Sequence, residues 1–291
     1  KEYYAEIPDG WAENDPKTHV AKCLAPWYGL KESAKIAGDQ LAALLTSVGM
    51  IENVMMPKVF FKWDQDDFIV CACHIDDAVW CTTSMKKLNH LLDRVDKSFA
   101  LTRTYEPTKL LGIEIQYDKV KGVMKIHQGS YMRAKLMELG HHAINRKTNS
   151  PGYIPPTKPN PDWKGNVKVK ATDEEVRLYQ RKIGIQMWAL QSDPSSMYVV
   201  HKLASSMLNP QPDDWKGIKR LEDYRNTYPE VGVVFHRALS KEKLTKGHNL
   251  DCLTYYADAD FGGDVRDSKS ISGYCVFLGE SGMFDWKSKK Q

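Results

Sequence analysis

The chain has 291 residues with a nearly balanced charge: 41 basic and 37 acidic side chains give a formal net charge of +4. This length suggests about two domains, and so small a net charge barely argues for a nucleic-acid partner. Hydrophobic residues make up 42% of the chain, enough for a packed core, and no apolar run is long enough to span a membrane.

Helical and strand-like patterns alternate along the first third of the chain. Apolar side chains at helical spacing predict a helix over residues 34–48, with Ser33 as its cap and Gly49 as its stop. A run of apolar and aromatic side chains predicts a strand over residues 59–63. An apolar stripe predicts an amphipathic helix over residues 85–99.

Two adjacent carboxylates separate a pair of apolar runs in this region. Residues 68–75 and 78–83 are rich in β-branched, aromatic and small side chains, and Asp76-Asp77 lies between them. A two-residue break of this kind predicts a β-hairpin with both carboxylates at its turn. Neighbouring carboxylates repel each other, and a divalent cation that neutralises them can serve phosphoryl transfer. Taken alone, such a pair is more often a polar turn.

A second hairpin, a short helix and a linker follow. Residues 110–117 and 123–126 are predicted to pair as strands, and residues 131–139 to form a helix. Short turns between strands favour an α+β sheet over repeated βαβ units. Residues 141–172 are rich in Pro, Asn and Lys, which predicts a linker or an extended basic strap. A basic strap can follow a phosphate backbone, and a solvated linker explains the composition equally well.

The last part of the chain predicts a helical segment and a second sheet. The helical patterns cover residues 173–191, 196–208 and 213–228. Four strand-like runs are assigned to the sheet: residues 231–235, 253–256, 273–278 and 283–286. Residues 253–256 are expected to pair with residues 273–278 in it. Asp258 and Asp260 are two apart at a strand end and share one face, which suits a metal-dependent nuclease. A polar strand end or an Asx turn is the commoner explanation for such a cluster.

Several motifs occur in a fixed order along nearly the whole chain. They occupy residues 6–11, 27–33, 74–77, 110–115, 209–221, 258–274 and 286–291. The second reads Trp-Tyr-Gly-Leu-Lys-Glu-Ser and the third His-Ile-Asp-Asp. In this order they resemble the reverse transcriptase and ribonuclease H segment of Ty1/copia-type retrotransposon polyproteins, where the corresponding motifs are Leu-Tyr-Gly-Leu-Lys-Gln-Ser/Ala and Tyr-Val-Asp-Asp.

The resemblance implies an α+β architecture in several parts. A partial polymerase palm and fingers with an antiparallel sheet is expected first, then a helical connector and a truncated ribonuclease H-like α/β domain. The implied boundaries are residues 1–140 for the reverse transcriptase fragment, 141–172 for the Pro/Lys-rich linker, 173–250 for the helical connection and 251–291 for the ribonuclease H-like part.

The resemblance also implies the site residues. Asp76 and Asp77 would be catalytic carboxylates that bind Mg²⁺ or Mn²⁺ in the polymerase, and we expect them to be exposed at a hairpin tip in a cleft. Asp258 would be the first metal ligand of the ribonuclease H, and we expect it to point from a central strand into open solvent. Template and incoming nucleotide would be bound by one short segment: Tyr28, Gly29, Leu30 and Lys31. His74 stands where the family has Tyr, near the primer end.

Three further carboxylate positions of the family, one of the polymerase and two of the ribonuclease H, have no counterpart in the sequence. The third polymerase carboxylate precedes the first motif in the family, and the partners of Asp258 follow the last one. Asp64, Asp66 and Asp67 on the preceding turn are the acids that would complete the first site if the chain is active. We expect the chain to be a piece of a longer protein and to be inactive as given.

Two other functions remain open at this stage, a non-catalytic nucleic-acid-binding module and a domesticated remnant. In the parent protein, the family implies an RNA template, a DNA primer, deoxynucleotide triphosphates and other polyprotein segments as partners, without a membrane. The six cysteines form no CxxC pair, which is typical of a reducing compartment. The family places such proteins inside the cell, in a cytoplasmic particle or the nucleus.

Overall fold

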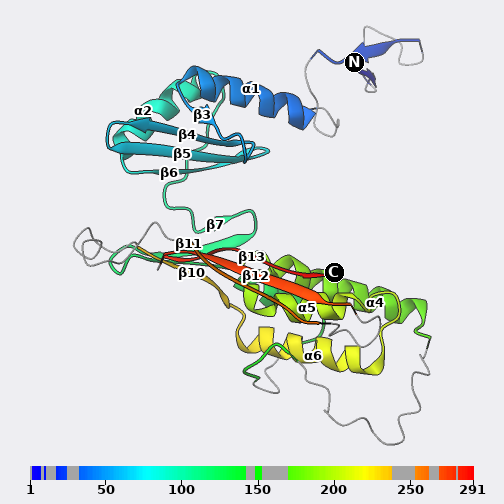
Figure 1. The fold of residues 1–291 in the computed structure, drawn as a ribbon. Coiled ribbons are helices and arrows are strands. Elements are labelled where there is room, and N and C mark those ends of the chain that lie inside the picture. Colours follow the sequence, from blue (N-terminus) through cyan, green and yellow to red (C-terminus); the bar gives the residue numbers. More distant parts are fainter. Residues whose placement is uncertain are drawn as a thin grey trace, which may run out of the picture. The chain divides into compact units, whose positions relative to one another are not determined.

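The computed structural model describes residues 2–7, 10, 18–24, 33–141, 148–152, 170–237, 253–261, 269–279 and 281–291. It is a mixed α+β fold with antiparallel sheets and, over these residues, six α-helices (Figure 1). The chain divides into two compact units, Lys1–Thr104 and Tyr105–Gln291, which are described separately. This division does not follow the expected boundary at residue 140, and the expected functional segments stay predictions.

The first unit is built on a four-stranded antiparallel sheet. Its strands follow the order β3 (Ile51–Glu52), β4 (Val59–Asp64), β5 (Asp67–His74) and β6 (Asp77–Thr82). Helices α1 (Ser33–Ser47) and α2 (Met85–Asp96) both lie on one side of it (Figure 1). A separate hairpin pairs β1 (Tyr4–Glu6) with β2 (Val20–Lys22). The predicted helices and the strand over residues 59–63 are confirmed.

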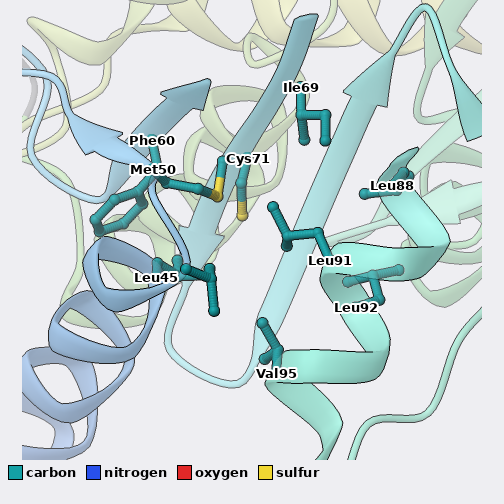
Figure 2. Packing of buried hydrophobic residues seen from close by; sticks show 10 residues of the cluster. Leu45, Met50, Phe60, Ile69, Cys71, Leu88, Leu91, Leu92 and Val95 are labelled. Carbon is teal, nitrogen blue, oxygen red and sulfur yellow. The ribbon is translucent and has the colours of Figure 1, made fainter. Parts of the chain in front are cut away.

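The core of this unit lies between the sheet and the two helices (Figure 2). Leu45 of α1, Phe60 of β4 and Cys71 of β5 are fully buried. The apolar stripe of α2 completes the cluster with Leu88, Leu91, Leu92 and Val95. Helix α2 starts where the Ser84 side chain accepts a hydrogen bond from the Lys87 backbone N–H.

The second unit contains a four-stranded antiparallel sheet in the order β10-β9-β8-β7. Its strands are β7 (Lys109–Leu110), β8 (Ile113–Asp118), β9 (Val123–His127) and β10 (Gly232–His236). The β8–β9 pair confirms the predicted second hairpin. Strand β10 was expected in the last sheet and instead pairs with β9. Gly232 permits this pairing, because a Cβ there would lie 2.0 Å from the Ile126 carbonyl oxygen.

Helices pack together in the second unit. They are α3 (Gly129–Glu138), α4 (Asp173–Ala189), the short 3₁₀ helix η1 (Pro194–Ser196), α5 (Met197–Ala204) and α6 (Pro212–Thr227). Their buried core includes Tyr179, Ile183, Val200 and Leu221. The Tyr179 hydroxyl donates to the Leu203 carbonyl oxygen at 3.0 Å, which satisfies its polar atom inside the core. The three helical patterns predicted for this segment are confirmed.

The last sheet has the order β11-β12-β13, with β11 (Leu253–Ala259), β12 (Ile271–Leu278) and β13 (Gly282–Lys290). The expected pairing of residues 253–256 with residues 273–278 is confirmed. Strand β13 contacts α5 and β10. Most of the predicted linker, residues 142–147 and 153–169, lies outside the described residues. No helix of the described part is long and apolar enough to cross a membrane.

Candidate functional site

The Asp76-Asp77 pair lies at the end of the β5–β6 hairpin, as predicted, but the turn is one residue earlier. Asp77 is the first residue of β6 and pairs with His74, so the turn consists of Ile75 and Asp76. The register places Cys71 opposite Trp80, both directed toward the core. A shift by one residue would move β6 side chains to the other face, so burial of this pair decides the turn.

The turn itself carries backbone strain. Ile75 has a φ of 53°, a left-handed conformation that is rare for a β-branched side chain, and the side chain is 67% exposed. Strain of this kind is tolerated where the surrounding structure imposes it, and it is frequent at functional sites. The two strands impose it here, because their hydrogen-bonded register leaves only two residues for the turn.

We expect Ile75→Asn to raise the free energy of unfolding by about 1 kcal/mol, because Asn adopts the left-handed region more readily. Urea denaturation of both variants measures the change. Val54→Asn is the matched control, since Val54 is exposed and β-branched but has no positive φ. Equal effects at the two positions would show that the turn is not strained.

The side chains at the hairpin end are open to solvent. His74, Asp76 and Asp77 are all exposed, which suits contact with a ligand. His74 and Asp77 are cross-strand neighbours, so their side chains lie on the same face of the hairpin. A pocket of about 350 Å³ in this unit includes neither carboxylate, and the expected cleft around them stays a prediction.

The described residues do not complete a metal centre at this hairpin. Among them, no group of three or more His, Cys, Asp or Glu side chains is placed to hold a metal ion. Asp76 and Asp77 supply two carboxylates, whereas two-metal chemistry requires a fuller ligand set around both ions. The described part of the chain therefore does not fit a two-metal centre by itself.

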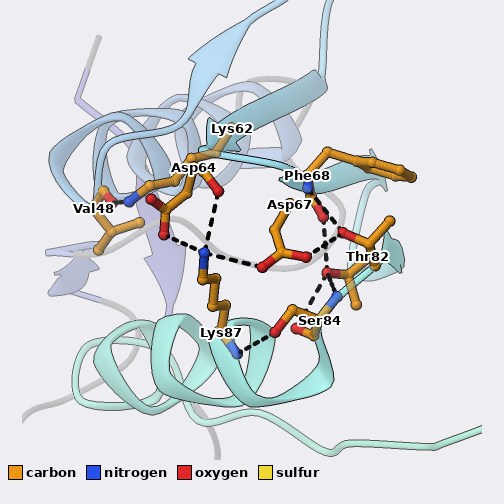
Figure 3. Close-up of polar contacts among 9 residues, drawn as sticks. Val48, Lys62, Asp64, Asp67, Phe68, Thr82, Ser84 and Lys87 are labelled. Carbon is orange, nitrogen blue, oxygen red and sulfur yellow. Dashed lines mark hydrogen bonds and ion pairs between the residues drawn. The ribbon is translucent and has the colours of Figure 1, made fainter.

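The acids of the preceding turn do not complete the site either. Asp64 ends β4 and Asp67 begins β5, so the length of β5 separates them from the Asp76 turn. Both carboxylates form ion pairs with Lys87, at 2.9 Å and 3.0 Å (Figure 3). Strand geometry puts their turn, which also carries Asp66, at the opposite end of the sheet from the hairpin carboxylates.

Asp258 lies on β11 and is exposed, as expected. β11 is an edge strand of the described sheet, however, and not a central strand as we expected. Asp258 and Asp260 line the same pocket of about 830 Å³, and their predicted shared face stays a prediction. Asp260 accepts a hydrogen bond from the Ile271 backbone N–H. This bond links the end of β11 to the start of β12. The metal roles of Asp258 and its neighbour stay predictions.

The expected nucleotide-binding segment, Tyr28, Gly29, Leu30 and Lys31, lies outside the described residues. Sequence reasoning missed the basic pocket beside Lys87 and the buried ion pair between Asp193 and Arg225. The first had a signal, since Lys86, His90 and Arg94 recur every four residues. The second had none, because its partners are far apart in the sequence.

Several known proteins similar to this chain are transposon polyproteins. It is 26% identical over its whole length to the retrovirus-related Pol polyprotein from transposon RE2 of Arabidopsis thaliana, and covers 18% of that protein. The RE1 polyprotein of the same plant is also 26% identical, over 99% of the chain. The polyprotein from transposon TNT 1-94 of Nicotiana tabacum is 23% identical over the whole chain, which covers 21% of it.

The chain is a relative of the Pol polyproteins of copia-type transposons. The predicted resemblance is thereby confirmed. The Pol-related chain spans about a fifth of the length of these relatives. No protein-family model matches it. No solved structure matches it significantly.

Proposed function

We propose that this chain is a segment of a retrotransposon RNA-directed DNA polymerase and ribonuclease H. In this proposal, Asp76 and Asp77 belong to the nucleotidyl-transfer site, and Asp258 belongs to the ribonuclease H site. The first unit corresponds to part of a palm, α4 to α6 to a connector, and β11 to β13 to the start of the ribonuclease H sheet. The exposed carboxylate pair on a hairpin with a buried core supports it most, in a chain related throughout to Pol polyproteins.

The ligands of this site follow from the same proposal. A bound Mg²⁺ or Mn²⁺ would neutralise the two carboxylates and the phosphates of a deoxynucleotide triphosphate. The rigid part of the hairpin is its β5 strand, where Ile69 and Cys71 are anchored in the core. That anchoring fixes where Asp76 and Asp77 emerge, so the chain contributes a positioned carboxylate pair. An RNA template, a DNA primer and other polyprotein segments are the partners we propose.

Metal binding at the hairpin tests the proposal directly. We expect Mn²⁺, added with a poly-rA/oligo-dT template–primer and dTTP, to broaden the backbone NMR signals of residues 74–77. Asp76→Asn should abolish the broadening, because Asn lacks the charge that holds the cation. Asp66→Asn is the control, since that carboxylate lies on the exposed turn at the other end of β5. Broadening that is equal in both variants would contradict the proposal.

Primer extension is the second test of this site. We expect no extension on poly-rA/oligo-dT with Mg²⁺ or Mn²⁺, because the described residues offer too few ligands to position two ions. Extension by the chain that disappears in Asp76→Asn would show that the polymerase assignment is right and the expected inactivity wrong. Extension that persists in Asp76→Asn would remove the hairpin from the proposed site.

A further inference from the structure

A basic pocket lies in the first unit, at the end of the sheet opposite the Asp76 turn. Its volume is about 350 Å³, within the range of small-ligand sites. Five basic side chains from β4 and α2 line it: Lys62, Lys86, Lys87, His90 and Arg94. Asp64 and Asp67 are the acidic residues at the same pocket.

The two acids both form ion pairs with one lysine of the protein. The Lys87 ammonium lies 2.9 Å from Asp64 Oδ2 and 3.0 Å from Asp67 Oδ2 (Figure 3). Thr83 donates a further hydrogen bond to Asp67 at 2.9 Å. The Lys87 hydrogen bond holds the pKa of Asp67 below its ordinary value, so its carboxylate is charged and already paired. Four permanent cations face two carboxylates, which leaves two positive charges in excess even with a neutral His90.

The excess charge belongs to side chains that lack protein partners. Lys86, His90 and Arg94 are exposed and form no hydrogen bond or ion pair with any described residue. They are four residues apart on α2, so they form one stripe along the helix. Lys62 donates to the Val48 carbonyl oxygen at 3.1 Å, which places its ammonium group beside the pocket.

Lys86, His90 and Arg94 have no side-chain partner among the described residues, so contacts within the fold do not explain the stripe. A ligand that carries several oxyanions would explain it. The rise from Lys86 to Arg94 is about 12 Å, and phosphates along one strand of a duplex are about 3.4 Å apart along its axis. Lysine binds phosphate as a point charge, and arginine can bind it with two parallel hydrogen bonds.

We propose that this pocket and the α2 stripe bind successive phosphates of a nucleic-acid strand. The site is separate from the Asp76-Asp77 hairpin, because the length of β5 lies between them. The inference rests on the proposed function in one respect, namely that nucleic acid is the ligand of the chain. The chemistry of the pocket itself is that of a polyphosphate site.

Fluorescence anisotropy with a labelled oligodeoxythymidine tests the site. We expect Lys86→Gln/Arg94→Gln to weaken binding about tenfold at low salt, and to lower the slope of log K against log[salt] by about 1.4, from 0.7 for each lost phosphate contact. Lys35→Gln/Lys97→Gln is the matched control: it removes two exposed charges of the same unit that do not line the pocket. The control should change affinity less than twofold.

Three results would overturn the inference. The first is wild-type affinity and salt slope in Lys86→Gln/Arg94→Gln. The second is an equal loss in the control pair, which would make the effect non-specific. The third is NMR shifts around Lys86 and Arg94 with inorganic tripolyphosphate but no binding of the oligonucleotide, which would assign the pocket to a free anion. Mn²⁺ broadening at residues 74–77 tests the proposed function and does not depend on the α2 stripe. A failure of the proposed function can therefore be distinguished from a failure of the phosphate-binding proposal.

Discussion

Arg225→Met should lower the free energy of unfolding of the second unit by about 3–5 kcal/mol, because it leaves a buried charge without a partner. Arg225 Nη1 lies 2.5 Å from Asp193 Oδ2, and each side chain is only 1% exposed. Among the described residues, Nε and Nη2 of Arg225 have no hydrogen-bond partner, so Asp193 is the main group that stabilises its charge. Burial lowers the pKa of Arg225, and the carboxylate opposes that effect.

Asp193 has a second structural task at the start of η1. Its carboxylate accepts hydrogen bonds from the Ser195 backbone N–H at 2.9 Å and from the Ser196 hydroxyl at 2.8 Å. The ion pair therefore ties α6 to the beginning of η1 and α5. A double substitution, Arg225→Met with Asp193→Asn, should cost less than the sum of the two single changes, because neither charge then remains buried alone.

Pulse proteolysis in urea measures these differences. Arg133→Met is the matched control, since Arg133 pairs with Glu230 at 3.1 Å while both side chains are more than two-fifths exposed. Exposed ion pairs contribute about 0–1 kcal/mol. A loss in Arg225→Met no larger than that in Arg133→Met would show that the buried pair does not hold these helices together.

Phe60→Ala should destabilise the first unit by about 3–5 kcal/mol, because a fully buried aromatic ring is replaced by a cavity. Phe60 belongs to the cluster that joins the sheet to both helices (Figure 2). Hydrogen exchange of residues 59–74 measures the loss, and the β5–β6 hairpin should exchange faster as its anchor weakens.

Trp63→Ala is the control for this substitution. Trp63 lies on the same strand, but it is 68% exposed and contacts the Phe68 ring with centroids 5.6 Å apart. Its removal should cost about 1 kcal/mol or less, since little apolar area is lost from the core. A loss at Trp63 that equals the loss at Phe60 would contradict the assignment of the core to the helix-covered face.

The spacing of apolar side chains was sufficient to predict most helices and strands, because these patterns depend on residues that are close together in the sequence. The stripe of Leu88, Leu91, Leu92 and Val95 predicted α2, and these residues are buried. Alternation and turn residues predicted the β8–β9 and β11–β12 pairs in the same way. The ordered motifs also predicted the relationship to Pol polyproteins, since each motif is local and its order needs no structure.

These elements, the relationship to Pol polyproteins and the carboxylate hairpin could all be predicted from local patterns in the chain. Tertiary structure decided the turn at Ile75-Asp76, because the register depends on burying Cys71 opposite Trp80. It also decided that β10 joins β9, which requires a backbone approach that only Gly232 allows. The Asp193–Arg225 pair and the Lys87 ion pairs likewise join residues that are distant in the chain. Local sequence patterns do not predict which distant side chains come into contact.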